Sequence, residues 1–290
     1  MRADYFNKRG VTVEIKPLAQ IERSIQKNYR KYIWSPFIKA IKDYKLIEEG
    51  DVIAVAISGG KDSLLMAKLF QMLHRHTEIN FTPIFISMDP GFNEVNKNNL
   101  IANCKHLDLP VHFYDSDIFE VAGRISGDYP CYMCARMRRG FLYARAKELG
   151  CNKLALGHHF DDVIETTMLN VLYAGNFKTM LPKLHSSNFE GLELIRPLYY
   201  IREESIKSFT TSHGIPAMNC GCSVAAGETS SKRREIKELI ATLKKTNPLV
   251  DKSIFKAAEN VNVDVVLGYQ MNNQKYSFLD FYDDEKIIEE

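Results

Sequence analysis

The fold is decided by the stretch Val52–Phe70, which reads VIAVAISGGKDSLLMAKLF. An apolar run ends in Ser-Gly-Gly-Lys-Asp-Ser, and a helical pattern follows at once. This order is typical of a buried strand that turns directly into a helix. Backbone amides at such a turn, with the positive end of the helix dipole, form a binding site for an anion. The glycines let the backbone approach a phosphate closely, and Lys61 adds a positive charge.

The alternation of strand and helix continues through the middle of the chain. Strand-like apolar runs occupy residues 52–57, 82–87, 111–114, 153–156 and 192–195, and helical patterns occupy 64–74, 95–106, 137–149 and 163–173. Such an alternation predicts crossover connections and an α/β fold, a doubly wound parallel sheet covered by helices on both faces.

Four segments are expected along the chain. A helical N-terminal extension covers residues 1–49, where Ser35-Pro36 interrupts the helical pattern. The α/β domain covers residues 50–215, helices continue the C-terminal part over 216–270, and an acidic tail covers 271–290. The tail is interpreted as a solvated terminus.

Composition narrows the class of protein. The 290 residues are 45% hydrophobic and 26% charged, which is ordinary for a globular protein, and the net charge is only +2. No apolar run approaches the roughly 20 residues of a membrane span. The first ten residues, MRADYFNKRG, lack the apolar core of a signal peptide. We therefore expect a cytoplasmic protein without a membrane segment.

Two motifs are expected to open at the same edge of the sheet. Ser58–Ser63 follows the first strand, and Gly157-His-His-Phe-Asp-Asp162 follows the strand at 153–156. In doubly wound sheets, ligands bind beyond the carboxyl ends of the strands. Asp161 and Asp162 suit either the positive end of a helix dipole or a Mg²⁺ ion at a phosphate. The histidines suit either a ligand contact or the core.

The phosphate loop belongs to neither of two common types. Its spacing differs from the Walker pattern and from the dinucleotide pattern Gly-x-Gly-x-x-Gly. The string SGGKDS resembles the loop of the PP-loop ATP pyrophosphatase superfamily. That resemblance implies cleavage of ATP between its α- and β-phosphates and adenylation of an oxygen on a substrate.

The six cysteines fall into two kinds. Cys104 and Cys151 stand alone in apolar patterns and are predicted to be core thiols. Four others form the close pairs Cys131/Cys134 and Cys220/Cys222. Four thiolates would suit structural zinc, whereas three thiolates on an iron–sulfur cluster would leave one iron open. The spacing leaves both kinds of metal site open.

Four stretches together resemble the tRNA 2-thiocytidine synthetase (TtcA) family, from about Tyr29 to Lys245. They read IEEGDVIAVAISGGKDS, CYMCARMRRGFLYARAKELG, LALGHHFDDVIETTMLNVLYAG and RPLYYIREESI. The resemblance implies an ATP-dependent tRNA sulfurtransferase that adenylates the C2 oxygen of a pyrimidine and replaces it with sulfur, forming 2-thiocytidine. The alternatives are the same chemistry on a tRNA uridine or a small molecule, and a nucleotide-binding protein with a structural four-cysteine zinc site.

The same resemblance implies the cofactors and partners. These are ATP, Mg²⁺ and a 4Fe–4S cluster, with tRNA, a sulfur donor (sulfide or a desulfurase-derived persulfide) and a possible homodimer. Cys131 and Cys134 take two cluster positions, and Cys220 takes the third. Cys222 is the alternative third ligand, because the short Cys-Gly-Cys departs from the family pattern; as a fourth ligand it would close the open iron.

The implied site residues lie in these motifs. ATP is expected to be held by Ser58, Gly59, Gly60, Lys61, Asp62, Ser63, Gly157, His158 and Asp161. Asp62 and Asp161 are candidates for metal binding or proton handling, and Arg138 for steadying the intermediate, whereas Arg136 and Arg139 are expected at the surface. By position alone, residues 86–92 could line an adenine pocket.

A basic N-terminal segment is the candidate tRNA contact. Residues 1–50 hold eleven Lys and Arg against six Asp and Glu. Arg23, Lys27, Arg30 and Lys31 lie among Tyr29, Tyr32 and Trp34, a combination suited to phosphate contact and base stacking. It equally suits a helix packed by its aromatic residues. Basic residues at 136–147 and near Lys232 could extend this surface.

Overall fold

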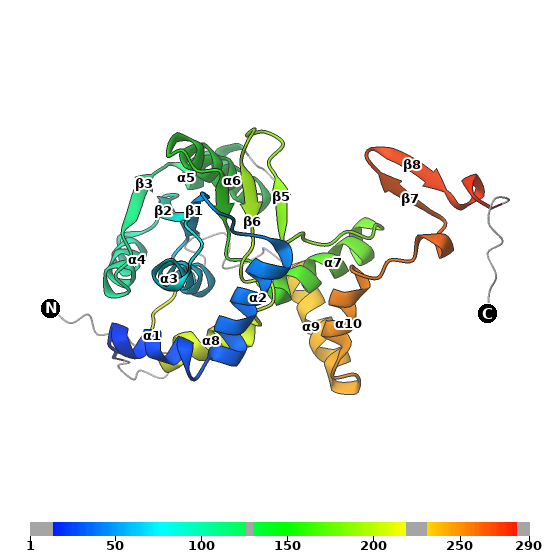
Figure 1. Ribbon diagram of the computed structural model, residues 1–290. Helices are drawn as coiled ribbons and strands as arrows, with labels where there is room; N and C mark the ends of the chain where they lie inside the picture. Colours follow the sequence, from blue (N-terminus) through cyan, green and yellow to red (C-terminus); the bar gives the residue numbers. More distant parts are fainter. Residues whose placement is uncertain (1–13, 126–129, 219–230, 283–290) are drawn as a thin grey trace.

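The computed structural model describes residues 14–125, 130–218 and 231–282 (Figure 1). A six-stranded sheet in the order β3-β2-β1-β4-β6-β5 forms its centre, and β7 and β8 form a separate hairpin. The strands are β1 (Val52–Ile57), β2 (Thr82–Asp89), β3 (Val111–Asp115), β4 (Lys153–Ala155), β5 (Lys183–His185), β6 (Glu193–Ile195), β7 (Gly268–Met271) and β8 (Gln274–Ser277).

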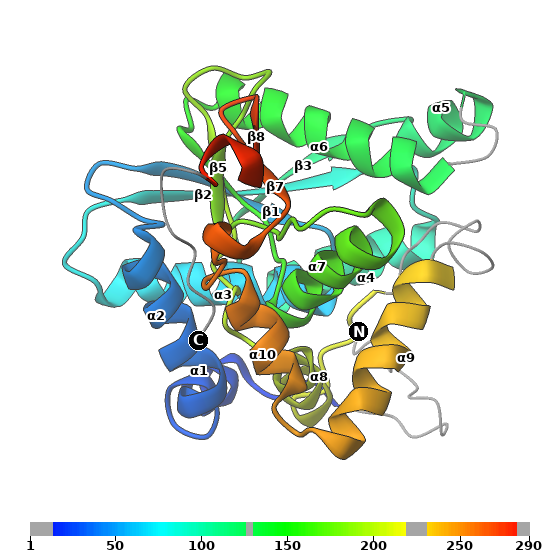
Figure 2. The same cartoon turned by 90° about the vertical axis from the view of Figure 1, so that its right-hand side faces the viewer.

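Helices cover both faces of the sheet. Figures 1 and 2 show α5 and α6 on one face, α3, α4 and α7 on the other, and α1, α2 and α8 as a further layer beyond α3. The helices are α1 (Leu18–Gln26), α2 (Ser35–Tyr44), α3 (Lys61–His76), α4 (Glu94–His106), α5 (Ile118–Ile125), α6 (Pro130–Glu148), α7 (Phe160–Ala174), α8 (Glu203–Ser212), α9 (Ser231–Thr246) and α10 (Val250–Ala257). Within the described ranges, no helix is both long and apolar enough to cross a membrane.

The alternation along β1 explains the two layers of core. Ile53, Val55 and Ile57 pack into the cluster shared with α3, whereas Ala54 and Ala56 face the cluster that contains Tyr143 of α6. The small alanine side chains leave room for α6 on their face. The predicted doubly wound α/β fold is confirmed.

The order of the strands places a switch point beside β1. β1 pairs in parallel with β2 on one side and with β4 on the other, so the chain winds outward in two directions. Ligand sites in such sheets lie where the order reverses, beyond the carboxyl ends of the strands. The phosphate loop after β1 and the Gly-His-His segment after β4 flank this point.

The structure adds elements that the pattern did not predict. β5 is short and polar and pairs antiparallel with β6, at the edge of the sheet. The hairpin β7–β8 crosses residue 271, where the acidic tail was expected to begin. Its turn is Asn272-Asn273, and both residues have positive φ, as a two-residue hairpin turn requires. Near the N-terminus, Ser35-Pro36 starts α2 directly after a π-helical turn at Arg30–Trp34.

A buried ion pair joins the starts of β1 and β4. Lys153 donates to Asp51 at 2.7 Å, and each side chain is only 5% exposed. Asp51 also accepts from the side chain of Asn152 and from the backbone of Glu48, each at 2.7 Å. Burial disfavours the charged amine, but Asp51 and Glu48 outweigh it and raise the pKa of Lys153.

Replacing Asp51 with Asn should lower the free energy of unfolding by about 3 kcal/mol, because it leaves a buried ammonium without its closest carboxylate. Urea unfolding followed by circular dichroism measures the loss. Glu148→Gln is the matched control, since it breaks an exposed pair with Arg145 on one helix and should cost less than about 0.5 kcal/mol. Equal losses in the two variants would contradict the burial argument.

Cys104 and Cys151 are both buried, which confirms their prediction as core thiols. Burial raises the pKa of Cys104 to about 12 and that of Cys151 to about 11. Because the thiolate is the reactive form, neither should react with iodoacetamide in the native protein at pH 8. Mass spectrometry after a short pulse should find both unmodified, and both alkylated once the chain is unfolded in urea. Rapid native alkylation of either thiol would show that its burial is wrong.

Candidate active site

The loop after β1 is held closed by its own serines. The backbone amide of Ser58 donates to Oγ of Ser63 at 3.1 Å, and Oγ of Ser63 donates to the carbonyl of Gly60 at 3.0 Å. Gly59 has a φ of +82°, a conformation that other residues adopt at a cost. The string SGGKDS therefore makes one tight turn into α3.

The first turn of α3 presents unpaired amides and a pair of charges. Gly60 precedes the helix and supplies no side-chain cap, so the first amides are available to an anion. Lys61 donates to Asp62 at 2.9 Å and pairs with Glu203 at 3.2 Å. Burial opposes the charge on Lys61, but these two carboxylates outweigh it and raise its pKa.

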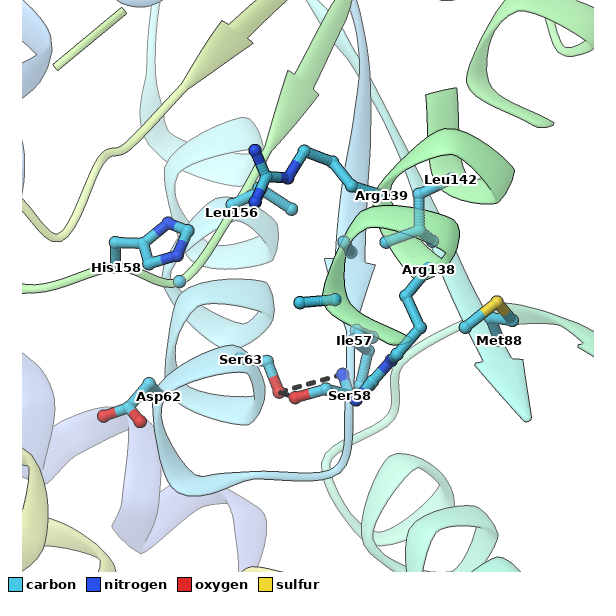
Figure 3. Close-up of a pocket in the computed structure, with 13 residues that line it drawn as sticks. Ile57, Ser58, Asp62, Ser63, Met88, Arg138, Arg139, Leu142, Leu156 and His158 are labelled. Carbon is cyan, nitrogen blue, oxygen red and sulfur yellow. Dashed lines mark hydrogen bonds between the residues drawn. The ribbon is translucent and has the colours of Figure 1, made fainter. Parts of the chain in front are cut away.

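A cavity of about 290 Å³ opens beside this loop (Figure 3). Its walls come from the end of β1, the first turn of α3, β2, α6 and the segment after β4. The lining residues are Ala56, Ile57, Ser58, Asp62, Ser63, Met88, Ala135, Arg138, Arg139, Leu142, Leu156, Gly157 and His158. One Asp62 carboxylate oxygen, Oδ1, is buried there without a hydrogen-bond partner among the described residues. The cavity thus combines an apolar wall with phosphate-binding groups.

The Cys-x-x-Cys pair lies at the start of α6, a helix that also lines the cavity. Cys131 and Cys134 both belong to its first turns, and Ala135, Arg138 and Arg139 follow on the cavity wall. Figure 3 shows both arginines of α6 extending into the cavity, Arg138 toward Ser58 and Arg139 toward His158. The side chain of Cys131 lies outside the described residues.

The segment that leads to the second cysteine pair contacts the phosphate loop. Met218 donates its backbone N–H to the carbonyl of Gly59 at 2.9 Å. A Cβ atom at Gly59 would lie 2.6 Å from the Met218 sulfur, so glycine permits this close contact. Cys220 and Cys222 themselves lie outside the described residues. The chain that leads to the second cysteine pair therefore contacts the loop after β1 at Gly59.

The segment after β4 packs closely against the start of α3. A Cβ atom at Gly157 would lie 3.2 Å from backbone atoms of Asp62 and Ser63. His158 lines the cavity, and its Nδ1 is buried without a hydrogen-bond partner in the part of the chain that the structure describes. Burial, and next the charge of Arg196, lower the pKa of His158 to about 4, so the ring is neutral at pH 7.

Comparison with known proteins identifies this architecture. A family model described as a PP-loop domain matches residues 19–219. The tRNA-cytidine(32) 2-sulfurtransferase of Geobacter metallireducens is 37% identical over 242 residues, covering 81% of this chain and 91% of the relative. That of Geotalea uraniireducens is 40% identical over 227 residues, covering 77% and 88%. The chain belongs to the PP-loop family, and within it to the family of these relatives.

A solved structure agrees with the fold. The U34-tRNA thiolase NcsA of Methanococcus maripaludis, with its [4Fe-4S] cluster, superposes with a TM-score of 0.64 at 20% identity. The alignment covers 88% of this chain and 87% of that one. The family resemblance expected from the motifs is confirmed by these comparisons.

Two of the predicted ATP-binding residues, Asp161 and Lys61, are not among the residues that line the cavity; both contact Glu203 of α8. Asp161 accepts the backbone N–H of Glu203 at 2.7 Å and so caps the start of α8. Lys61 lies on the same side, through its pair with Glu203. His159 and Asp162 bond each other's backbone amides in a capping box at the start of α7. That box accounts for His159 as a packed residue, one of the two expectations for the histidines.

The basic N-terminal residues lie away from the PP-loop cavity. Arg23, Lys27, Arg30 and Lys31 are all exposed. Tyr29 points inward, where its hydroxyl bonds Ser208 and Ser212 of α8. Near the start of α9, Arg233 pairs with Asp162 at 3.2 Å and thereby docks that helix on α7. The aromatic packing favours the structural interpretation for Tyr29, and the tRNA role of the four basic residues stays a prediction.

Sequence reasoning missed two residues near the PP-loop site. Arg196 follows β6 and is buried, with its Nε lacking a hydrogen-bond partner among the described residues. The carboxyl-edge rule that selected the loops after β1 and β4 would also have selected Arg196, because β6 is parallel to β4. Met218 carried no such signal, since its contact with Gly59 depends on tertiary structure.

Proposed function

We propose that this protein is an ATP-dependent tRNA sulfurtransferase that adenylates the C2 oxygen of a tRNA cytidine and replaces that oxygen with sulfur. The observation that carries the proposal is the meeting of three segments at one cavity. The PP-loop, the first turns of α6 with Cys134, and the segment after β4 all contribute to it or adjoin it. The names of the relatives, which are tRNA-cytidine(32) 2-sulfurtransferases, support the choice of reaction and substrate.

The PP-loop residues would bind the phosphates of ATP. The amides at the start of α3 would donate to the pyrophosphate that leaves, and Lys61, the first residue of that helix, would offset part of its charge. The apolar wall of Met88, Leu142 and Leu156 suits the adenine ring. Attack of the C2 oxygen on the α-phosphorus then forms the O-adenylate and releases pyrophosphate. Attack of sulfide at C2 later releases AMP.

Two side chains suit the reacting atoms. Arg138 extends toward Ser58 and would stabilise negative charge on the α-phosphate. His158 is neutral at pH 7. Its ring could therefore hydrogen-bond the substrate without placing a second positive charge beside Arg139. Arg196 and burial both disfavour the imidazolium.

The donor set fits the two inorganic groups that the proposal needs. Asp62 lines the cavity, and its Oδ1 has no hydrogen-bond partner among the described residues and lies 3.8 Å from Nε2 of His159. A carboxylate there suits Mg²⁺, which takes oxygen ligands and substrate phosphates. Cys131 and Cys134, three positions apart at the start of α6, suit an iron–sulfur cluster, with Cys220 or Cys222 as the third ligand. A cluster with one open iron would supply the sulfide. From the same family resemblance we also propose that the protein acts in the cytosol, takes sulfur from sulfide or a persulfide donor, and forms a homodimer.

Nucleoside mass spectrometry tests the proposed function. Unmodified tRNA is incubated without oxygen with cluster-reconstituted protein, ATP, Mg²⁺ and sulfide, then digested. We expect 2-thiocytidine, formed only when ATP is present. A 2-thiouridine product would move the chemistry to a uridine. No thionucleoside, with about four iron atoms verified per chain, would contradict the proposal, and about one zinc atom per chain would favour the structural zinc alternative.

A further inference from the structure

A second cavity, of about 370 Å³, lies beside α6. One wall is α6 itself and the other is the connection between β5 and β6, which together form what we name the α6 groove. The residues that line it are Ala135, Arg136, Arg139, Gly140, Tyr143, Leu184, His185, Ser186, Ser187, Asn188 and Phe189. Ala135 and Arg139 also line the 290 Å³ cavity beside the loop after β1, which we name the ATP cavity, so the two spaces adjoin at α6.

The described lining of the α6 groove is basic. None of the described residues that line it is acidic, and Arg136 and Arg139 are both exposed. No ion pair joins either arginine to a carboxylate within the described ranges. Arginine forks bind phosphate oxygens in a bidentate manner. The electrostatics therefore favour an anion that spans the groove and the ATP cavity.

Arg196 adds a buried positive charge behind the junction of the two cavities. It is 8% exposed, and its charge acts on Arg139, Tyr143 and His158. Burial lowers its pKa to about 10, but it stays a cation at neutral pH. Arg196 donates to the carbonyl of Leu181 but has no carboxylate partner among the described residues, and an unpaired buried charge is costly.

The wall of the α6 groove formed by the β5–β6 connection carries an aromatic ring and exposed polar side chains. Phe189 stacks on Tyr143 of α6, with 5.3 Å between the ring centroids and 12° between the planes. Its backbone amide donates to Oγ of Ser186, and Ser186 donates to the carbonyl of Leu192, so the connection is internally braced. Ser187 and Asn188 are exposed on this braced wall. Aromatic faces, hydroxyls and arginines are the groups that hold single-stranded RNA.

We infer that the α6 groove binds the single-stranded loop of the tRNA substrate next to the nucleotide that is modified, with its phosphates on Arg136 and Arg139. This inference rests on the proposed function and names where its macromolecular substrate binds. The nucleotide beyond Arg139 then enters the ATP cavity, where the reacting oxygen meets the α-phosphate. Loop nucleotides are unstacked at small cost, which suits entry from this side.

Binding of unmodified tRNA at several salt concentrations tests the groove. Two variants address its opposite walls: Arg136→Ala removes a phosphate contact, and Ser187→Glu adds a negative charge on the braced connection. Each should weaken tRNA binding roughly 5- to 10-fold, and Arg136→Ala should reduce the salt slope by about 0.7 for one single-strand phosphate. The affinity for ATP should stay within twofold of the wild type, because neither residue lines the ATP cavity.

Lys105→Ala is the control, since this exposed lysine on α4 lines a different cavity. It should leave tRNA affinity within twofold. Unchanged tRNA affinity in both groove variants would overturn the inference, as would a loss confined to Arg136→Ala, which would put the RNA on the outer face of α6 only. Thiolation by the wild type is measured in parallel. A wild type that forms no thionucleoside fails the proposed function, whereas a thiolating wild type with unaffected variants fails the groove alone.

Discussion

Asp62→Asn should lower the rate of ATP-dependent thiolation about 1,000-fold, because it removes a negative charge expected to hold Mg²⁺ at the phosphates. Asp62 stands in the first turn of α3, where its Oδ2 accepts a hydrogen bond from Lys61 and its Oδ1 has no hydrogen-bond partner among the described residues. Asparagine keeps the size of the side chain, so the fold should be preserved. Single-turnover formation of 2-thiocytidine under anaerobic conditions measures the effect.

Two controls make the Asp62 result specific. The iron content and the visible absorption of Asp62→Asn should equal those of the wild type, because the cysteines are untouched. Asp115→Asn, on an exposed aspartate at the end of β3 that pairs with Lys97, should leave thiolation within twofold. Loss of iron in Asp62→Asn would mean that the carboxylate supports the structure around the cysteines. Activity within tenfold of the wild type would remove Asp62 from the proposed metal site.

Cys134→Ser should abolish thiolation and reduce the iron content from about four atoms per chain to well below one. A cluster held by three thiolates cannot keep four irons when one of the thiolates in the Cys-x-x-Cys pair is lost. Cys134 stands one residue before the wall of the ATP cavity, so the change is local to α6. Iron analysis and visible absorption of the anaerobically reconstituted variant give the readout.

The matched control for Cys134→Ser is Cys151→Ala, which removes a buried thiol outside the site. It should retain iron and thiolation, although it costs some stability through the cavity it leaves. Full iron content in Cys134→Ser would show that another residue holds the cluster. One zinc per wild-type chain, lost in this variant, would instead support the structural zinc site.

Much of the fold could be predicted because the inner strands β1, β4 and β6 are buried almost throughout. β1 reads as an uninterrupted apolar run, and its predicted bounds, 52–57, are those observed. β5 could not be found in this way, because Lys183 and His185 give it no apolar period and pairing with β6 alone makes it a strand. The hairpin was missed although Asn272-Asn273 is a favourable turn for it.

The site was predicted where local sequence dictates its geometry. The PP-loop and the segment after β4 meet because parallel strands end at the same edge, which follows from the order of the elements. Asp161 was expected at the phosphates because it is acidic and begins a helix. Its hydrogen bond to Glu203 depends on how α8 packs, which the spacing along the chain does not encode. The α6 groove is likewise a product of tertiary structure, since its two walls are about fifty residues apart.

The hydrogen bond from Met218 to Gly59 has a thermodynamic consequence. The chain that leads to Cys220 and Cys222 is hydrogen-bonded to Gly59, a residue that the proposed function places at the nucleotide. If that function holds, a shift of this peptide would affect the binding of nucleotide and of metal together. A change that ATP makes in the binding constant for iron would then be matched by an equal change that iron makes in the binding constant for ATP.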